Sequence, residues 1–151
     1  MLDELIGFGA ADRFEIRRVP DEFFADAEGD VAEQAGFAFA VASDHFHPWL
    51  ESQGHSPYTW SVLGAVAHAT KRMRLETYVT CPIFRYHPTI VAQKAATIAL
   101  LSEGRFSLGL GAGERLNEHI VGVGWPSTDV RHEMMEEAVD VIRMLWEGDY
   151  V

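Results

Sequence analysis

The sequence predicts an α/β fold with a parallel sheet, and three observations lead to that prediction. Short apolar segments alternate with longer amphipathic segments, giving four strand–helix units in order along the chain. Alternation of this kind is typical of parallel strands joined by right-handed crossovers. Polar residues follow the apolar segments directly, which is where α/β barrels place their active sites. The length of 151 residues suits either an open doubly wound sheet or half of an eight-stranded barrel, since a full barrel has about 250 residues.

The first half of the chain contains two of these strand–helix units. Leu5–Phe8 is predicted to be a short strand, and a helix is expected to begin at Pro20 and to end at Gly36. The wholly apolar segment Phe39–Ala42 is typical of a strand buried on both faces of a parallel sheet. A helix follows from Thr59 to about Thr70, because its apolar residues recur at helical spacing.

The second half repeats the pattern twice. We expect a strand at Leu75–Val79 and then a helix that begins at Pro88, where proline suits the first turn. The segment Arg105–Leu110 is the fourth predicted strand. A long helix from Val130 to about Trp146 has the clearest apolar face, and we expect it to pack on the core.

Charge and composition exclude several classes of protein. The chain has 12 Lys and Arg against 23 Asp and Glu, a net charge of -11, so we expect neither a nucleic-acid surface nor binding to anionic membranes. No apolar run approaches the roughly 20 residues of a membrane span, and the N-terminus lacks the features of a signal peptide. A single cysteine, Cys81, fits the reducing cytoplasm. These totals predict a cytoplasmic protein.

The most informative segment is Ser43–Trp49, which follows the buried strand predicted at Phe39–Ala42. It contains an acid, two histidines and a tryptophan at the point where the strand ends. Polar side chains in that position indicate an active site in an α/β barrel. The alternative is a turn capped by Asp44, with histidines that serve only structure.

A second informative segment follows the fourth predicted strand. Gly109, Gly111 and Gly113 alternate and allow a ligand to approach the backbone closely. A dinucleotide fingerprint would require glycine at position 114, and Glu114 stands there instead. A plain strand-to-helix turn is the other interpretation, with Glu114 favoured by the helix dipole. However, Glu114 and His45 would both lie at the carboxyl end of one sheet, two strands apart, as a general base and a general acid.

Two alternatives of other classes stay open at this point. His45 and His47 resemble a metal-binding pair to which His55 and His119 could add ligands, as in a metal-dependent hydrolase. The other alternative is an inactive half-barrel, whose uncovered strand edges would favour association with another chain.

Four strings in this order resemble the luciferase-like monooxygenase superfamily. They are Ser43–Trp49, Gln53–Pro57, Thr80–Pro88 and Gly109–Glu118. More narrowly, they resemble the branch that depends on coenzyme F420 and contains the F420-dependent glucose-6-phosphate dehydrogenases. The similarity covers nearly everything from about residue 36 to residue 146. It implies a TIM (β/α)8 barrel of which residues 1–151 form the N-terminal half as one domain.

The resemblance also implies an activity and catalytic residues. It implies hydride transfer between a substrate alcohol, such as a sugar phosphate, and the deazaflavin coenzyme F420, with FMN as the alternative cofactor of a luciferase-like monooxygenase. Glu114 would be the base on the substrate hydroxyl, His45 the acid near the transferred hydride, and Trp49 part of the site wall. A homodimer is expected as well.

The cofactor would lie across the carboxyl ends of the strands, on a set of residues carried over by the resemblance. A non-prolyl cis peptide is implied between Tyr78 and Val79, behind the ring. The implied cofactor-binding residues are Asp44, Tyr78, Val79, Cys81, Ala112, Gly113 and Asn117.

Three of these residues depart from the family pattern. Cys81 and Ala112 stand where the sugar-phosphate enzymes have threonine, and Tyr78 replaces a smaller serine. The basic residues that bind the substrate phosphate in the family lie in the second half of the barrel. The identity of the alcohol therefore stays open.

Overall fold

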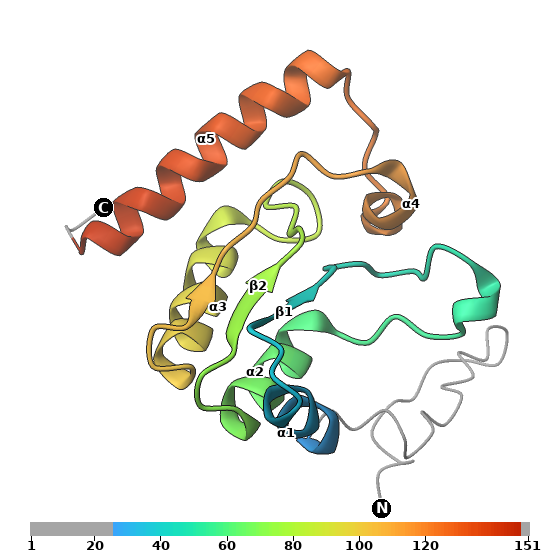
Figure 1. Ribbon diagram of the computed structural model, residues 1–151. Coiled ribbons are helices and arrows are strands. Elements are labelled where there is room, and N and C mark those ends of the chain that lie inside the picture. The colour runs from blue at the N-terminus through green and yellow to red at the C-terminus, as the bar shows by residue number, and fades with distance from the viewer. Residues whose placement is uncertain (1–25, 149–151) are drawn as a thin grey trace, which may run out of the picture.

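The computed structural model describes residues 26–148 and contains a parallel sheet in the order β1-β2-β3. The strands are β1 (Phe39–Ala42), β2 (Arg74–Thr77) and β3 (Phe106–Ser107), and each pairs in parallel with the next. In Figure 1 they lie side by side with helices along one side. The predicted parallel α/β fold is confirmed, while the expected strand at Leu5–Phe8 and the expected helix start at Pro20 lie outside the described residues.

The helices follow the predicted alternation. They are α1 (Asp26–Gln34), α2 (Thr59–Ala69), α3 (Pro88–Leu101), α4 (Arg115–Glu118) and α5 (Thr128–Glu147), with 3-10 turns η2 (Glu51–Gln53) and η3 (His119–Val121). Helix α3 begins at the predicted proline, and the preceding His87 caps it by accepting a hydrogen bond from the Thr89 amide. Gly36, predicted to close the first helix, has φ +92° just beyond α1. Among residues 26–148, the short α4 and the 3-10 turns η2 and η3 are the elements that the sequence did not predict.

Two of the strands are shorter than their apolar runs predict. The ladder between β2 and β3 pairs Leu75 with Phe106 and Glu76 with Ser107, and an isolated bridge joins Thr80 to Leu110 farther along. Between these points the Gly109 amide donates to the Thr77 hydroxyl at 3.0 Å. A side-chain oxygen thus replaces a ladder carbonyl there, and regular pairing is interrupted.

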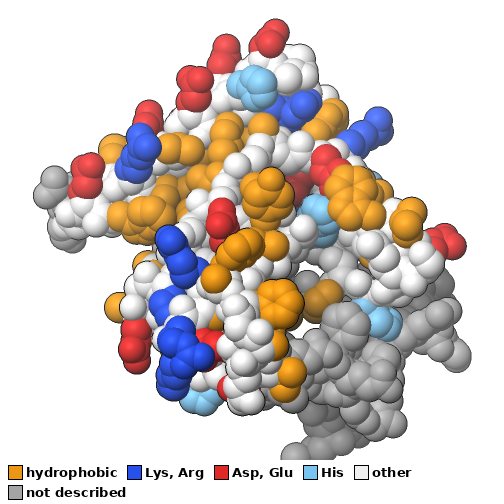
Figure 2. Space-filling model, in the orientation of Figure 1, with side chains coloured by type: hydrophobic (Ala, Val, Ile, Leu, Met, Phe, Trp, Pro, Cys, Tyr) orange, Lys and Arg blue, Asp and Glu red, His pale blue; other side chains and the backbone are white. Residues whose placement is uncertain are grey.

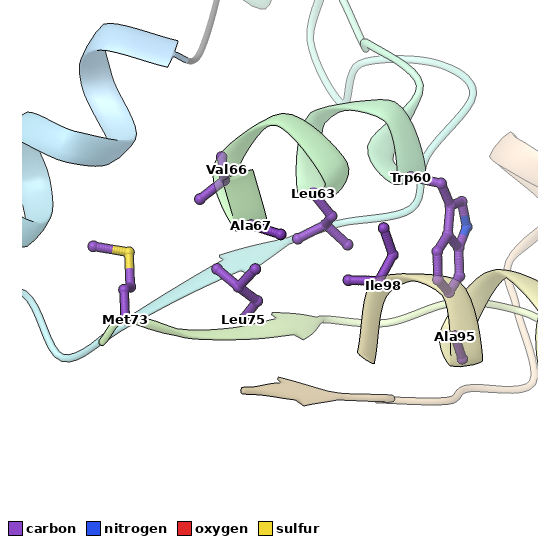
Figure 3. Close-up of a cluster of buried hydrophobic side chains, with 8 residues drawn as sticks. All are labelled: Trp60, Leu63, Val66, Ala67, Met73, Leu75, Ala95 and Ile98. Atoms are coloured by element: carbon purple, nitrogen blue, oxygen red, sulfur yellow. The ribbon is translucent and has the colours of Figure 1, made fainter. Parts of the chain in front are cut away.

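The core lies between the sheet and helices α2 and α3. Figure 3 shows its buried side chains: Trp60, Leu63, Val66, Ala67, Met73, Leu75, Ala95 and Ile98. Leu75 is fully buried at the centre of the sheet. Burying a side chain of this size contributes about 2 kcal/mol of hydrophobic stabilisation, so this cluster holds α2 and α3 against the sheet.

Strand β1 corrects one prediction, because it is not buried on both faces. Ala40 and Ala42 pack against the core, whereas Phe39 and Val41 are 64% and 51% exposed. Successive side chains of a strand point to opposite faces, so the sheet has one covered face and one open face within residues 26–148. Figure 2 shows hydrophobic side chains at the surface over the strands and beside α5.

Two polar residues fix the amino ends of the strands. Glu33 of α1 accepts hydrogen bonds from the amides of Lys71, Arg72 and Met73, just before β2. Arg105 donates to the carbonyls of Ala67, Thr70 and Met73 and to the Thr70 hydroxyl. These contacts lie at the end of the sheet opposite to the loops described below.

Helix α5 packs against α3, as predicted for its apolar face. Ile142 joins Val91 and Ala92 in a second buried cluster. The Trp146 indole donates to the carbonyl of Ala92 at 3.1 Å. The helix therefore belongs to the packed structure, although much of its length faces solvent (Figure 1).

Candidate functional site

Three loops meet at the carboxyl ends of the strands and form a cleft of about 490 Å³. They follow β1, β2 and β3 respectively, which is the arrangement that the sequence predicts for an active site. Every predicted site residue lines this one cleft: Asp44, His45, Trp49, Tyr78, Val79, Cys81, Ala112, Gly113, Glu114 and Asn117. Cleft volumes of a few hundred Å³ are typical of small-molecule sites.

His45 and Glu114 lie next to each other in the cleft. The distance between His45 Nε2 and Glu114 Oε1 is 3.7 Å, and the two side chains are 18% and 32% exposed. Trp49 places its ring edge-on to the His45 imidazole, with the centroids 5.1 Å apart. The predicted acid and base thus share one hollow, within reach of a single bound molecule.

Hydroxyl groups fix the loop that carries His45. Ser56 donates to the His45 carbonyl at 2.8 Å, and Thr59, the first residue of α2, donates to the Ser43 carbonyl at 2.6 Å. The Ser43 hydroxyl in turn donates to the Tyr78 carbonyl at 3.1 Å. The loop after β1 is therefore attached both to α2 and to the loop after β2.

Asn117 joins the loop after β1 to the loop after β3. Its side chain is buried, and its Oδ1 accepts hydrogen bonds from the amides of Phe46 and His47, each at 2.7 Å. Its Nδ2 donates to Glu114 Oε1. One side-chain amide thus orients the carboxylate of Glu114 and holds the backbone beside His45.

Asp44 is buried beneath the cleft and its carboxylate is surrounded by donors. Oδ2 accepts from Trp60 Nε1 at 2.8 Å and from Thr80 Oγ1 at 2.9 Å. Oδ1 accepts from the Tyr86 hydroxyl at 3.2 Å and lies 3.4 Å from Arg85 Nη2. A buried carboxylate needs such partners, because burying an unpaired charge is unfavourable by several kcal/mol, on the order of 5.

Arg85 and Glu118 form a buried ion pair behind the site. Arg85 Nε lies 3.0 Å from Glu118 Oε1, and the two side chains are 7% and 2% exposed. Burial alone would lower the pKa of Arg85, but the hydrogen bond to Glu118 and the charge of Asp44 raise it. In Tyr86, burial first and then the charge of Asp44 raise the pKa.

From the sequence, Arg85–His87 suits either the mouth of the site or a cap of the following helix, and the pairing of Arg85 with Glu118 was not predicted. They lie 33 positions apart, so no helical or strand periodicity relates them. Their position in the sequence was the available signal. Arg85 lies after β2 in the string Thr80–Pro88, and Glu118 directly follows Asn117 in the string Gly109–Glu118. An arginine that is buried after one strand requires acidic partners, and here the loop after β1 and helix α4 supply them.

The floor of the cleft is built from small and apolar residues. The expected cis peptide bond between Tyr78 and Val79 is present. Gly113 has φ +74°, and a Cβ at this position would lie 2.6 Å from Cys81 Sγ. Burial, followed by the charge of Glu118, raises the pKa of Cys81 to about 12, so its thiol is protonated at neutral pH.

The geometry fits a flat aromatic ring better than a metal ion. Val79 and the closely packed Gly111 and Gly113 leave an apolar wall that a ring could cover, in the same cleft as His45 and Glu114. Over residues 26–148, no group of three or more His, Cys, Asp or Glu side chains is arranged to hold a metal ion. His47 instead stacks on His119, with ring centroids 5.7 Å apart.

None of the described helices is long and apolar enough to cross a membrane.

Comparison with known proteins gives a consistent family. A model of the luciferase-like monooxygenase family matches residues 27–151. The chain is 46% identical over 125 residues to the F420-dependent hydroxymycolic acid dehydrogenase of Mycobacterium tuberculosis, covering 83% of this chain and 35% of that protein. It is 45% identical over 121 residues to the F420-dependent glucose-6-phosphate dehydrogenase of Beutenbergia cavernae, covering 80% of this chain and 36% of that protein.

A solved structure agrees with these relatives. The F420-dependent secondary alcohol dehydrogenase in complex with an F420-acetone adduct superposes with a TM-score of 0.78 at 46% identity, covering 83% of this chain and 38% of that one. The chain thus spans a little more than a third of the length of these three proteins, which is consistent with half of a barrel. The family model, the sequence identity and the structural superposition together show that the chain belongs to the luciferase-like monooxygenase family.

Proposed function

We propose that this chain carries the proton-handling half of an F420-dependent dehydrogenase or reductase. The observation that carries the proposal is the 3.7 Å approach of His45 to Glu114 in a cleft formed by three strand ends. The F420-dependent dehydrogenases to which the chain is 45–46% identical support it. The reaction is hydride transfer between a substrate alcohol and the deazaflavin, in either direction.

Glu114 acts as the base that takes the proton of the substrate hydroxyl. Among the described residues both of its contacts use Oε1, which leaves Oε2 for the substrate. The hydrogen bond donated by Asn117 fixes the orientation of the carboxylate. His45 acts as the partner acid, since imidazole exchanges a proton near neutral pH.

The cofactor lies against the apolar wall of the cleft. Val79 and the backbone of Ala112 and Gly113 would hold the ring, and Tyr78, Cys81, Asp44 and Asn117 line the same cleft. When bound, the deazaflavin supplies a carbon centre that accepts or gives hydride. Trp49, whose ring meets the His45 imidazole edge-on, lines the cleft beside His45.

The substrate is a small alcohol, with a sugar phosphate as one candidate. The net charge of -11 makes this part of the chain a poor site for a phosphate, so a phosphorylated substrate would be bound mainly by its hydroxyl-bearing end here. We further propose a homodimer located in the cytoplasm, without nucleic-acid partners.

Fluorescence titration with F420 and with FMN tests the proposal. It is carried out on the chain and on a chimera in which residues 27–147 replace the matching segment of the Mycobacterium tuberculosis relative. We expect F420 to bind the chimera more tightly than FMN. Glu114→Gln should retain F420 binding and lower turnover of a secondary alcohol by about 10²–10⁴-fold, the usual contribution of a general base.

The control is His68→Gln, which changes an exposed residue on α2 and should alter neither quantity. A folded chimera that binds FMN and consumes oxygen would instead assign a monooxygenase. A folded chimera that binds neither cofactor would overturn the proposal.

A further inference from the structure

One arginine contacts two of the three loops that form the cleft, and it comes from the third. Arg85 lies between β2 and α3. Its Nη2 donates to the carbonyl of Asp44, the residue before His45, and lies 3.4 Å from the Asp44 carboxylate. Its Nε and its backbone amide donate to the two carboxylate oxygens of Glu118, at 3.0 and 3.2 Å.

The two partners of Arg85, Asp44 and Glu118, lie close in sequence to His45 and Glu114 respectively. Asp44 directly precedes His45. Glu118 is the last residue of α4, the helix whose N-cap is Glu114. The side chains of Arg85, Asp44 and Glu118 are 7%, 1% and 2% exposed, so water cannot replace these contacts. Charge-assisted hydrogen bonds in such surroundings are strong and have a fixed direction.

We propose that Arg85 is the positioning residue that fixes His45 and Glu114 in one site by joining the loop after β1 to α4. Its planar guanidinium reaches both partners from one rigid group, which the single ammonium of lysine cannot do. The loop and α4 also meet through Asn117, whose Oδ1 accepts from the amides of Phe46 and His47 at 2.7 Å. Those two amides therefore report whether the loop and the helix stay together.

The test is hydrogen exchange of individual amides in Arg85→Lys. We expect the protection of the Phe46 and His47 amides to fall by about tenfold, while the Leu75 amide in the sheet, bonded to the Arg105 carbonyl at 2.9 Å, keeps its protection. Glu118→Gln serves as a second variant, because it keeps the shape of the side chain and offers only one acceptor oxygen to Arg85. It should show the same selective loss.

Arg105→Lys is the matched control. Arg105 also bridges several chain segments, but it does so at the opposite end of the sheet. We expect this variant to lower protection at Leu75 at least as much as at Phe46 and His47. If Arg85→Lys and Glu118→Gln lower all amides equally, or leave those of Phe46 and His47 unchanged, the positioning role is wrong.

The catalytic part of this inference rests on the proposed function and has its own readout. In the chimera, Arg85→Lys should lower kcat for a secondary alcohol by about tenfold or more with little change in KM, since misplacement of reacting groups affects turnover most. Hydrogen exchange needs no cofactor. A chimera that fails to bind F420 while the Phe46 and His47 amides lose protection would overturn the proposed function and leave the role of Arg85 intact.

Discussion

Gly113 illustrates at the residue scale how the cleft depends on a missing side chain. Its φ of +74° lies in the left-handed region, and a Cβ there would approach Cys81 Sγ to 2.6 Å and Glu118 Cγ to 3.1 Å. Gly122 has nearly the same φ, +72°, but a Cβ there would meet nothing within 4 Å. Alanine variants of Gly113 and Gly122 therefore separate the cost of backbone strain from the cost of crowding.

We expect Gly122→Ala to lower the free energy of unfolding by about 1 kcal/mol, the usual cost of a left-handed alanine. Gly113→Ala should lower it by a further 1–3 kcal/mol, roughly the range for overpacking, because the buried thiol has little room to move. Urea unfolding measures both values. Equal losses in the two variants would contradict the crowding argument.

The site residues were predictable where they stand next to a strand end. All ten predicted residues line the cleft, because residues at the carboxyl ends of neighbouring parallel strands must lie close together. The pairing of Arg85 with Glu118 was missed, since a pairing between distant segments leaves no periodic mark in the sequence. Asp44 and Asn117 were predicted as cofactor contacts, but the sequence did not reveal that each also binds several protein groups.

At the scale of elements, α1 is attached to the start of β2 by one carboxylate. The amide of Arg72 first, and those of Met73 and Lys71 after it, lower the pKa of Glu33 to about 2. A carboxyl whose pKa is lower in the folded protein stabilises the fold above its unfolded pKa of about 4.3, and this contribution disappears as the pH falls toward 2.

Glu33→Gln should therefore destabilise the chain at pH 7 and have a progressively smaller effect as the pH falls from 5 to 2. Urea unfolding of the wild type and the variant, at a series of pH values, measures the difference. Glu51→Gln in the exposed turn η2 is the control and should show no such trend. A difference between wild type and Glu33→Gln that does not vary with pH would refute the role of the ionised carboxylate.

Helices were predicted more accurately than strands. The helices expected from Thr59, from Pro88 and from Val130 are present within two residues of their predicted starts. Their apolar spacing is set by packing on one side, which the sequence records directly. The ends of β2 and β3 were less accurate, because the Thr77 hydroxyl interrupts the ladder and apolar runs do not encode such a bond.

At the scale of the whole molecule, the sheet has one covered and one open face. The prediction that β1 is buried on both faces was wrong for residues 26–148, since Phe39 and Val41 stand exposed while their alternating neighbours pack on the core. The parallel order of the strands was predictable from the alternation of elements. Whether a second layer covers a strand depends on other parts of a barrel, and an apolar run of four residues cannot report that.

We expect the open face to bind the apolar dye ANS in the native chain. Replacing Phe39 and Val41 together by Thr should reduce the ANS fluorescence, while keeping residues that suit a strand. Leu50→Thr is the control, because Leu50 is 62% exposed but lies in a loop. An equal reduction by Leu50→Thr would show that the dye does not select the sheet face.

The charges around the cleft impose a direction on any guest molecule that has one ionic end. Asp44, Glu114 and Glu118 contribute carboxylates to its lining, and no lysine or arginine is among the lining residues that the structure describes. Arg85 pairs with Asp44 and Glu118, so Glu114 is the carboxylate that would repel a negatively charged tail, whereas a neutral ring would not be repelled. An amphiphilic guest will thus enter with its uncharged end first and leave its anionic end pointing outward.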